Sequence, residues 1–585
     1  MDKEINPLRH TGAHLLAAAI KNIYPNTRLG TSHDNGAEFA YDFDFVTPIK
    51  VEDFEKIEAE MARILKLKPK MEMIEKTRPE ARRLLEKGSE VYKMEILTEI
   101  PRSEKITFYK LDNFMDLCAG PHITDVSKIK AFKLTKITGA YWRADAKNKM
   151  LTRIYGVAFD KASELDDFIK HQEEIKRRDH NRIGRDLGYF TTVDIIGQGL
   201  PLLMPNGAKV IQLLQRFVED EEAKRGYLLT KTPFMAKKEL YQLSGHWSYY
   251  KPSMFIMGNE LLDEEVFALR PMTCPFQFYV YKNSIKSYRD LPVRYNETST
   301  LFRNEDSGEM HGLIRVRQFT ISEGHIIARR DQVNQIFDEV IDLVNYCMKA
   351  LGIADDVTYR LSKGAAEGDT KGKDKYVGDP ASWRASEDEI RKVLVKHKIK
   401  FTEADDEAAF YGPKIDIQFK NVYGKEDTLI TIQLDFALAE RFDMTYIDEN
   451  GHKVFPLVIH RTSIGCYERV LAMLIEKTAG FMPVWLAPMQ AVVMGITDAH
   501  NEYTERVFEK LLAQGIRATR DTRNEKVGYK IREYTIQRVP FMIVAGDKEI
   551  EKGAVSVRTR EGVDLGQMTV ENFIELVQKS CKEFK

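Results

Sequence analysis

The chain has 585 residues, of which 43% are hydrophobic and 30% charged, and its formal net charge is −1. This balance suits a globular protein of roughly three to five domains, and it excludes an overall basic charge as the means of holding nucleic acid. The start MDKEINPLRH lacks the pattern of a signal peptide, and no apolar run reaches the roughly 18 residues of a membrane helix. Five cysteines do not make a disulfide framework in a chain of this length. We therefore expect a cytoplasmic protein without membrane contact.

The first 160 residues predict a mixed α/β unit. Residues 10–23 have a helical apolar pattern, and residues 38–45 and 106–111 read as short strands. Residues 161–184 are charged with sparse apolar positions, which is typical of an exposed helix that bridges two domains.

Proline and glycine cluster at 197–207 and mark the start of a new unit. A helix is predicted from residue 208, and Gly226 stands where a helix ends. The apolar residues of this predicted helix share one face: Val210, Ile211, Leu213, Leu214, Phe217 and Val218. Aromatic and β-branched runs over 227–480, without strict alternation of strand and helix, predict an antiparallel sheet flanked by helices. The polar, glycine-rich residues 363–383 predict an exposed loop.

The last hundred residues alternate between strand and helix patterns, which predicts a parallel or mixed sheet with helices. The expected strands are 491–497, 516–522 and 541–547, and the expected helices are 501–515 and 526–538. The predicted domains are 1–160, a linker helix at 161–184, 185–484 and 485–585.

Four charged residues lie close together in the central unit: Arg303, Glu305, Arg315 and Arg317. Because strand-type residues surround them, we expect them to project onto the faces of a sheet. Arginine donates two hydrogen bonds at once to phosphate, and adenylyl transfer needs positive charge on phosphate oxygens. A solvated strand face with ion pairs would show the same composition, so these residues alone leave both interpretations open.

Two groups of residues offer metal-ligand chemistry. Cys274, His325 and His460 are separated by 51 and 135 residues, which matches no local zinc signature, so each could equally be a core residue. His10 and His14 are spaced i, i+4 on one helix face, and Cys118 and His122 form a second pair. From spacing alone, the second group could be a zinc site or incidental histidines on a surface helix.

Longer stretches carry a family resemblance. FRNEDSGEMHGLIRVRQF (302–319) resembles motif 2 of the class II aminoacyl-tRNA synthetases, GCYER (465–469) resembles motif 3, and the helix ending at Gly226 with Pro233 resembles motif 1, the dimer element. RPMTCP, SYRDLP, AFYGPKID and IQLDF are similar to the threonyl-tRNA synthetase family, and the similarity runs from about residue 10 to residue 570. The resemblance implies an α+β and α/β multidomain fold: an α+β editing domain, a class II antiparallel sheet flanked by helices, and a C-terminal α/β anticodon-binding domain. The family's small extra N-terminal domain is expected to be lacking.

The implied activity is that of a threonine-tRNA ligase. Such an enzyme activates L-threonine with ATP and Mg²⁺, transfers it to tRNA(Thr), and acts as a homodimer. The resemblance assigns catalysis to Arg303, Glu305, Arg315 and Arg469, with Arg303 on the α-phosphate, Arg469 toward the γ-phosphate and Phe319 against adenine.

The resemblance also implies one zinc ion on Cys274, His325 and His460. Three protein ligands leave one position open, and a substrate amine and hydroxyl there would separate threonine from valine, which a hydrophobic pocket cannot do well. The implied threonine-binding residues are Glu323, Tyr411, Gln433 and Cys466. Many members of the family carry aspartate and serine where this chain has Glu323 and Cys466.

The N-terminal group resembles an editing site, and Lys93 and Asp116 match further positions there. Serine differs from threonine by one methyl group, which binding discriminates only about 10–200-fold, so a second hydrolytic site for seryl-tRNA is expected. A histidine with a near-neutral pKa could orient water or carry its proton. Cys118 could act as a nucleophile, but we favour a positioning role.

The C-terminal unit has a basic stretch that could be a solvated face or an RNA-binding surface: Arg517, Arg520, Arg523, Lys526, Lys530 and Arg532. By resemblance, Asn524, Glu549 and Arg558 would read anticodon bases. Two alternatives stay open, namely a synthetase for serine or proline, and a catalytically silent relative that only binds RNA.

Overall fold

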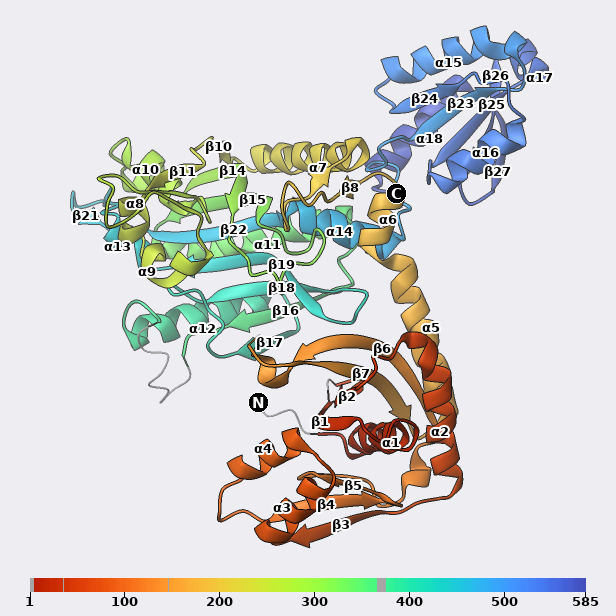
Figure 1. The fold of residues 1–585 in the computed structure, drawn as a ribbon. Coiled ribbons are helices and arrows are strands. Elements are labelled where there is room, and N and C mark those ends of the chain that lie inside the picture. Colours follow the sequence, from red (N-terminus) through yellow and green to blue (C-terminus); the bar gives the residue numbers. More distant parts are fainter. Residues whose placement is uncertain (1–4, 35, 146, 366–374) are drawn as a thin grey trace. The chain divides into compact units, whose positions relative to one another are not determined.

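The computed structural model describes residues 5–34, 36–145, 147–365 and 375–585. The chain divides into two compact units, Met1–Glu174 and Ile175–Lys585, and Figure 1 shows the elements of each. The division falls inside helix α5 (Ala162–Arg178). The three boundaries between the four segments expected from the sequence stay predictions.

The described residues of the N-terminal unit form two antiparallel sheets, four complete α-helices and the first part of α5. The four-stranded sheet has the order β1 (Arg28–Asp34), β2 (Phe39–Asp44), β7 (Met150–Phe159), β6 (Ala131–Tyr141). The three-stranded sheet has the order β3 (Met71–Lys76), β4 (Ile106–Leu111), β5 (Phe114–Leu117). The helices are α1 (Pro7–Ile23), α2 (Phe54–Lys66), α3 (Arg78–Lys87) and α4 (Val91–Glu99).

Helix α1 is the buried centre of this unit. Asn6 caps it, because its side chain accepts hydrogen bonds from the backbone N–H groups of Leu8 and Arg9, and Pro7 suits the first helical turn. Every residue from His10 to Ile20 is buried, so α1 is a core helix. The interpretation of His10 and His14 as incidental residues of a surface helix is therefore wrong.

The second unit contains an eight-stranded sheet that is antiparallel except at its two edges. Its order is β10 (Leu228–Leu229), β14 (Val293–Phe302), β15 (Gln318–Ala328), β22 (Leu457–Cys466), β19 (Glu426–Asp435), β18 (Lys414–Lys420), β16 (Val357–Ser362), β17 (Phe401–Ala404). Helices packed with this sheet include α7 (Pro205–Lys224), α11 (Val333–Ala350), α12 (Pro380–Lys396) and α14 (Tyr467–Thr478). The expected antiparallel sheet flanked by helices is confirmed.

The two faces of this sheet pack against different apolar clusters. Ile326 and Ile459 belong to a large apolar core shared with α7, α11, α12 and α14, whereas their neighbours Ile327 and Val458 belong to a separate cluster on the other face. Side chains alternate along a strand, so odd-numbered positions of β15 and even-numbered positions of β22 face away from the helices. That second face carries the candidate site.

The C-terminal part has the expected mixed sheet, in the order β24 (Ala518–Asp521), β23 (Ala491–Gly495), β25 (Phe541–Ala545), β26 (Ala554–Thr559), β27 (Asp564–Thr569). Its helices are α15 (Asn501–Ala513), α16 (Val527–Ile536), α17 (Asp547–Lys552) and α18 (Val570–Lys582). The first three strands are parallel and the last two pair antiparallel.

Two local expectations were wrong. The predicted bridging helix at 161–184 is two helices, because Asp179 interrupts it and caps α6 (His180–Asp186), in which His180 and Ile183 are buried. The predicted loop at 363–383 ends earlier, because Asp379 caps α12, which starts at Pro380; residues 366–374 of that loop lie outside the described residues.

No helix in the described ranges combines the length and the apolar character needed to cross a membrane.

The remaining short elements connect the larger ones and include α8 (Lys238–Leu243), α9 (His246–Tyr250), α10 (Cys274–Lys282) and α13 (Leu438–Arg441), together with the small strands β8 (Phe190–Thr191), β9 (Leu202–Leu203), β11 (Met235–Lys237), β12 (Ile256–Met257), β13 (Phe267–Leu269), β20 (Tyr446–Ile447) and β21 (Lys453–Val454).

A buried ion pair joins α7 to the sheet. Glu222, 2% exposed, accepts hydrogen bonds from Arg461 at 2.5 Å, from the Ser463 hydroxyl at 2.6 Å and from the Asn296 amide at 2.6 Å. A buried charge that loses its partner costs far more than the pair contributes.

We predict that Glu222→Gln lowers the free energy of unfolding by about 3–5 kcal/mol, because it leaves the Arg461 guanidinium buried without a counter-charge. Urea unfolding followed by circular dichroism measures the change. The control is Asp220→Asn on the exposed side of the same helix, for which we expect a change below about 0.5 kcal/mol. Equal stability of the two variants would contradict the prediction.

Candidate active sites

Strand register places one row of polar side chains across the central sheet. His325 of β15 lies opposite His460 of β22, His460 lies opposite Gln433 of β19, and Gln433 lies opposite Lys414 of β18. All four belong to the face turned away from the helices, because side chains alternate along each strand. Pairing of β15 with β22 therefore brings together His325 and His460, which are more than a hundred positions apart in the sequence.

Cys274, the first residue of α10, completes a group with His325 and His460. One ligand atom from each of these three buried residues lies within 4.8 Å of the others. His325 Nδ1 donates to the Gln277 side-chain oxygen at 2.5 Å, and His460 Nε2 donates to the Asp435 carboxylate at 2.9 Å. Each donation leaves a lone pair on the other ring nitrogen, as in histidines that bind a metal.

This group fits a zinc ion by the chemistry of its donors. His325 Nε2 is buried without a hydrogen-bond partner among the described residues, although buried polar atoms are almost always paired. Burial lowers the pKa of His325 well below its usual value and raises the pKa of the Cys274 thiol. Two neutral imidazoles and one sulfur are a common zinc ligand set, and a cation beside them would favour the thiolate.

A cavity of about 280 Å³ beside this group gathers the residues predicted to bind ATP. Its lining includes Arg303, Glu305, Arg315, Phe319, Gln433, Cys466 and Arg469. The Arg303 guanidinium lies 5.2 Å from the Phe319 ring centre, and Arg469 donates to the Ile314 carbonyl at 3.0 Å. The cavity thus offers guanidinium groups beside a buried aromatic face, which suits a nucleotide.

One expectation about these residues was wrong. Arg303, Glu305, Arg315 and Arg317 do not project from strand faces, because β14 ends at Phe302 and β15 begins at Gln318. All four lie in the connection between these strands. Arg315 donates to the Glu305 carboxylate at 2.9 Å and to Glu309 at 2.7 Å, so this connection carries its own charged network.

Residues predicted for the threonine pocket lie beside the zinc-type group. The Tyr411 hydroxyl donates to Gln433 at 2.6 Å, and its ring stacks on His460 with centres 4.9 Å apart. Glu323 accepts from the Thr273 backbone N–H at 3.2 Å, and burial raises its pKa. Cys466 lines the 280 Å³ cavity together with Gln433, and its thiol donates to Glu468 at 3.2 Å.

Sequence reasoning missed several residues of these sites. The 280 Å³ cavity is also lined by Lys414, Asp416, Thr428, Thr431 and Thr462. Lys414 and Asp416 lie in AFYGPKID, a stretch quoted above, so the signal was present but was read only for Tyr411. The partners of the two zinc-type histidines, Gln277 and Asp435, were also missed.

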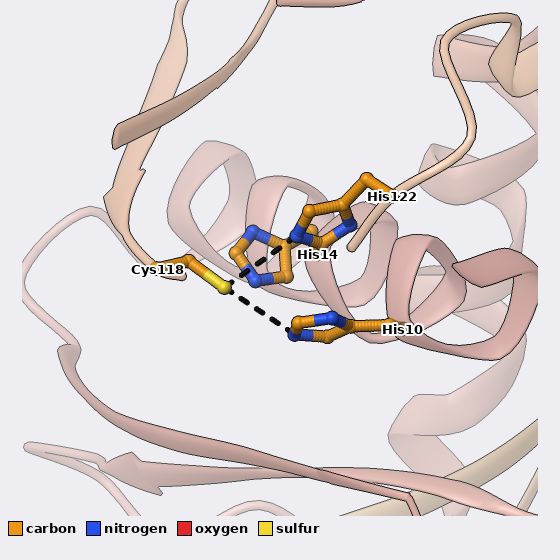
Figure 2. A group of neighbouring side chains, drawn as sticks. All are labelled: His10, His14, Cys118 and His122. Carbon is orange, nitrogen blue, oxygen red and sulfur yellow. Dashed lines mark hydrogen bonds between the residues drawn. The ribbon is translucent and has the colours of Figure 1, made fainter. Parts of the chain in front are cut away.

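The N-terminal group is equally compact. His10 and His14 project from α1, and Cys118 and His122 come from the segment after β5, as Figure 2 shows. One ligand atom from each lies within 4.8 Å of the others. Cys118 Sγ is 3.4 Å from His10 Nε2 and 3.5 Å from His122 Nε2.

Hydrogen bonds fix two of these imidazole tautomers. His10 Nδ1 donates to the Pro121 carbonyl at 3.0 Å, so its Nε2 carries a lone pair. The Thr11 hydroxyl donates to the Pro7 carbonyl at 2.7 Å and must accept from His122 Nδ1 at 3.2 Å, which leaves a lone pair on His122 Nε2. Two lone pairs therefore converge near the Cys118 sulfur. The one on His10 Nε2 also accepts from the Ser32 hydroxyl at 3.0 Å, so a cation or a water O–H would share or displace that contact.

Buried polar and charged side chains lie next to these four residues. The Tyr41 hydroxyl donates to Asp116 at 2.5 Å, and Lys93 pairs with Asp116 at 2.8 Å. His14 is 1% exposed, and neither of its ring nitrogens has a hydrogen-bond partner among the described residues. Lys93 and Asp116 thus adjoin the group as the resemblance implied, and Tyr41 is an additional member that sequence reasoning missed.

The expected near-neutral histidine pKa is not found here. Burial lowers the pKa of His10, lowers that of His14 well below its usual value, and lowers that of His122 to about 2. Burial also raises the pKa of the Cys118 thiol to about 11. At neutral pH these groups are uncharged, so they are suited to orienting a ligand and not to storing a proton or supplying a thiolate.

In the C-terminal part, the three residues expected to read bases have different environments. Asn524 and Arg558 are exposed, whereas Glu549 is 8% exposed. Its carboxylate accepts from the Gly546 backbone N–H at 3.0 Å, Ser556 at 2.8 Å and Gln567 at 2.6 Å. Glu549 therefore already caps α17.

The expected basic stretch is not one solvated face. Lys530 is buried, and Arg517 is held by the carbonyls of Ala487 and Trp485 at 2.9 Å each. The exposed members are Arg520, Arg523, Lys526 and Arg532.

Family models and solved structures show which proteins this chain is similar to. Residues 257–478 match the class II tRNA synthetase core domain (G, H, P, S and T), residues 490–580 match an anticodon binding domain, and residues 106–155 match the threonyl and alanyl tRNA synthetase second additional domain. A threonyl-tRNA synthetase RNA-binding-domain structure from Cryptosporidium parvum Iowa II superposes with a TM-score of 0.64 at 30% identity, covering 69% of this chain and 98% of that one. A prolyl-tRNA synthetase structure from Cryptosporidium parvum, at 17% identity and a TM-score of 0.53, covers 69% of this chain and 75% of that one and shares the fold alone. The chain is thus built as a class II aminoacyl-tRNA synthetase.

Curated relatives narrow the class to one family. A threonine–tRNA ligase of Clostridium perfringens is 55% identical over 97% of this chain and 87% of its own length. One of Oceanobacillus iheyensis is 43% identical over 99% of this chain and 88% of its own length. At these identities and lengths, the chain belongs to the threonine–tRNA ligase (threonyl-tRNA synthetase) family.

We predict that Cys118 reacts slowly with iodoacetamide at neutral pH. With its pKa raised to about 11, the reactive thiolate fraction should rise about tenfold for each unit between pH 7 and pH 9, without a plateau. Mass spectrometry of the Cys118 peptide measures the rate, and the urea-unfolded chain is the control, for which the rise should level off near pH 9. A plateau near pH 8 in the folded protein would contradict the prediction.

Proposed function

We propose that this chain activates L-threonine with ATP and transfers it to tRNA(Thr). The observation that carries the proposal is the adjacency of the two sites in the central sheet, where Gln433 both lines the nucleotide cavity and bonds to Tyr411 beside His460. Threonine held at the zinc-type group would thus have its carboxylate close to the α-phosphate of ATP.

In the adenylation step, a threonine carboxylate oxygen attacks the α-phosphorus and pyrophosphate leaves. Arg303 would bind the α-phosphate, Arg469 the γ-phosphate, and Phe319 would stack on adenine. Glu305 and Arg315 already pair with each other, so they would orient the phosphates together, with Mg²⁺ neutralising charge on ATP. Fixed guanidinium groups in a partly enclosed cavity stabilise charge that develops on the phosphate oxygens.

Zinc would be held by Cys274, His325 and His460, and it would supply a Lewis-acid position for the amine and hydroxyl of threonine. Valine lacks the hydroxyl, so this position discriminates where shape does not. Glu323, buried at the same group, would accept a hydrogen bond from the zinc-bound amine. The raised pKa of its carboxyl group would then fall, because a nearby cation favours the carboxylate.

The N-terminal group would hydrolyse seryl-tRNA(Thr). Serine offers the same amine and hydroxyl as threonine, so a site that recognises both cannot reject it. The lone pairs of His10 and His122 would orient a water molecule toward the ester carbonyl, and Asp116 with Lys93 would fix the polar wall behind it. The extra methyl group of threonine would occupy the place of that water.

Transfer RNA would be bound in part by the C-terminal domain, through the exposed side chains of Asn524 and Arg558. Glu549 would have to break its capping hydrogen bonds before it could reach a base. Arg558→Ala should weaken aminoacylation and leave threonine-dependent pyrophosphate exchange unchanged; an equal loss of both would contradict this role.

The chain would assemble as a homodimer through α7 and the residues after it. Leu228, Leu229 and Phe234 expose 58%, 66% and 45% of their surface, and a hollow of about 890 Å³ next to them is lined by residues that include Pro233 and Tyr279. Exposed apolar surface of this kind marks a protein interface. A monomer in sedimentation at micromolar concentration would contradict this assembly.

We predict about one equivalent of zinc per chain in the purified protein, and pyrophosphate exchange that depends on threonine and not on valine. Cys274→Ala should lose both the metal and the exchange, since two histidines alone hold zinc weakly. Elemental analysis and exchange assays measure these results, with the buried Cys347→Ala as the matched control. Full exchange by a zinc-free protein would contradict the proposal, and two equivalents would indicate metal at the N-terminal group.

We predict that Cys118→Ala combined with His122→Ala lets seryl-tRNA(Thr) accumulate while threonine charging stays within about twofold of the parent. The reason is that these substitutions remove the His122 lone pair and the neighbouring sulfur, so that His10 alone cannot orient the water, while the central sheet stays intact. Charging of tRNA with labelled serine measures the product, and Cys581→Ala serves as a control. If the double variant clears seryl-tRNA as fast as the parent, the N-terminal group is not the editing site.

A further inference from the structure

A buried histidine lies directly behind the loop that carries three of the proposed ATP-binding residues. His180, the first residue of α6, is 0% exposed. Its Nδ1 is 2.6 Å from the Glu476 carboxylate of α14, and its Nε2 is 3.3 Å from the backbone nitrogen of Leu313. His180 thus joins the helix that carries Arg469 to the loop 303–317.

The two contacts define the state of the ring. Because a backbone N–H can only donate, His180 Nε2 must accept from Leu313, and the proton of the neutral ring must lie on Nδ1. There it is donated to Glu476, which is 1% exposed. The carboxylate therefore selects the tautomer that can hold the loop.

The backbone of the 311–315 turn packs closely against the His180 ring. Residues 311–315 form a tight turn in which the backbones of His311 and Arg315 bond to each other in both directions, at 3.2 and 3.3 Å. Gly312 has φ +49, and a Cβ there would lie 2.1 Å from His180 Nε2. Only glycine permits so close an approach at this backbone conformation.

The turn is held from two sides at neighbouring residues. His180 accepts from the N–H of Leu313, and Arg469 donates to the carbonyl of Ile314 at 3.0 Å. Arg315 follows immediately and reaches Glu305 and Glu309. A shift of this turn would therefore move Arg315 and release Arg469 together.

We propose that His180 is a positioning residue for ATP, which fixes the 311–315 turn through Leu313 so that Arg315 and Arg469 meet the phosphates. This inference rests on the proposed function, because it assigns the cavity to ATP. His180 touches no reacting atom and acts only through the loop.

Two amide substitutions separate its two contacts. The amide of glutamine reaches about the position of Nε2 and can accept from Leu313, whereas the shorter amide of asparagine reaches about the position of Nδ1 and can donate to Glu476. In threonine-dependent pyrophosphate exchange, His180→Asn should raise the KM for ATP about 5- to 20-fold and leave the KM for threonine within about twofold. His180→Gln should restore most of the affinity for ATP.

The melting temperatures of the two variants should follow the opposite order to their affinities for ATP. His180→Asn keeps a partner for the buried Glu476 carboxylate and should melt at a higher temperature than His180→Gln, which leaves that charge unpaired. A purely structural role would make KM and melting temperature change together. The matched control is His171→Asn on the exposed surface of α5, which should equal the parent in both measurements.

Gly312→Ala tests the same contact from the loop side if the His180 variants fold poorly. Its added Cβ would push the turn off His180, so the KM for ATP should rise as in His180→Asn, with the Glu476 contact intact. The inference is overturned if glutamine fails to restore ATP affinity relative to asparagine, or if Gly312→Ala binds ATP like the parent. A parent chain without threonine-dependent exchange would instead contradict the proposed function.

Discussion

The pairing register of three strands is the constraint on which the central site depends. β15, β22 and β19 lie side by side so that His325, His460 and Gln433 stand in one row on one face of the sheet. A shift of one residue in either pairing would turn a histidine into the apolar core on the other face. The large core under α7, α11 and α14 therefore does more than stabilise the sheet, because it fixes which side chains line the candidate site.

Burial determines the chemistry of both candidate sites. Desolvation keeps His10, His122 and His325 uncharged at neutral pH, and hydrogen bonds to carbonyl, amide or hydroxyl oxygens fix which ring nitrogen keeps its lone pair. The two groups differ in their surroundings. The central group lies beside the guanidinium groups of the nucleotide cavity, whereas the N-terminal group is backed by Asp116 and Lys93.

Under the proposed function, this difference would match two steps of substrate selection. A zinc position that reads a hydroxyl would separate threonine from valine but accept serine, and a water-positioning site that is sensitive to one methyl group would remove serine afterwards. The two sites lie in separate compact units, so each can be altered without the other. Correct charging would then depend on both, although neither would need to discriminate against every competitor.

The sequence by itself determined the family, the mixed C-terminal sheet, the antiparallel central sheet and the members of both histidine groups, because long motifs and local periodicity carry these features. It did not determine that 303–317 is a connection between strands, since charged residues in loops and on strand faces have the same local composition. It also missed the burial of His180, because a histidine among charged residues reads as exposed until α14 and the turn at Leu313 surround it. Tautomers, lowered pKa values and the partners Gln277, Asp435 and Tyr41 were decided only by tertiary structure, because each arises between segments that are distant in the chain and meet only when the sheets have formed.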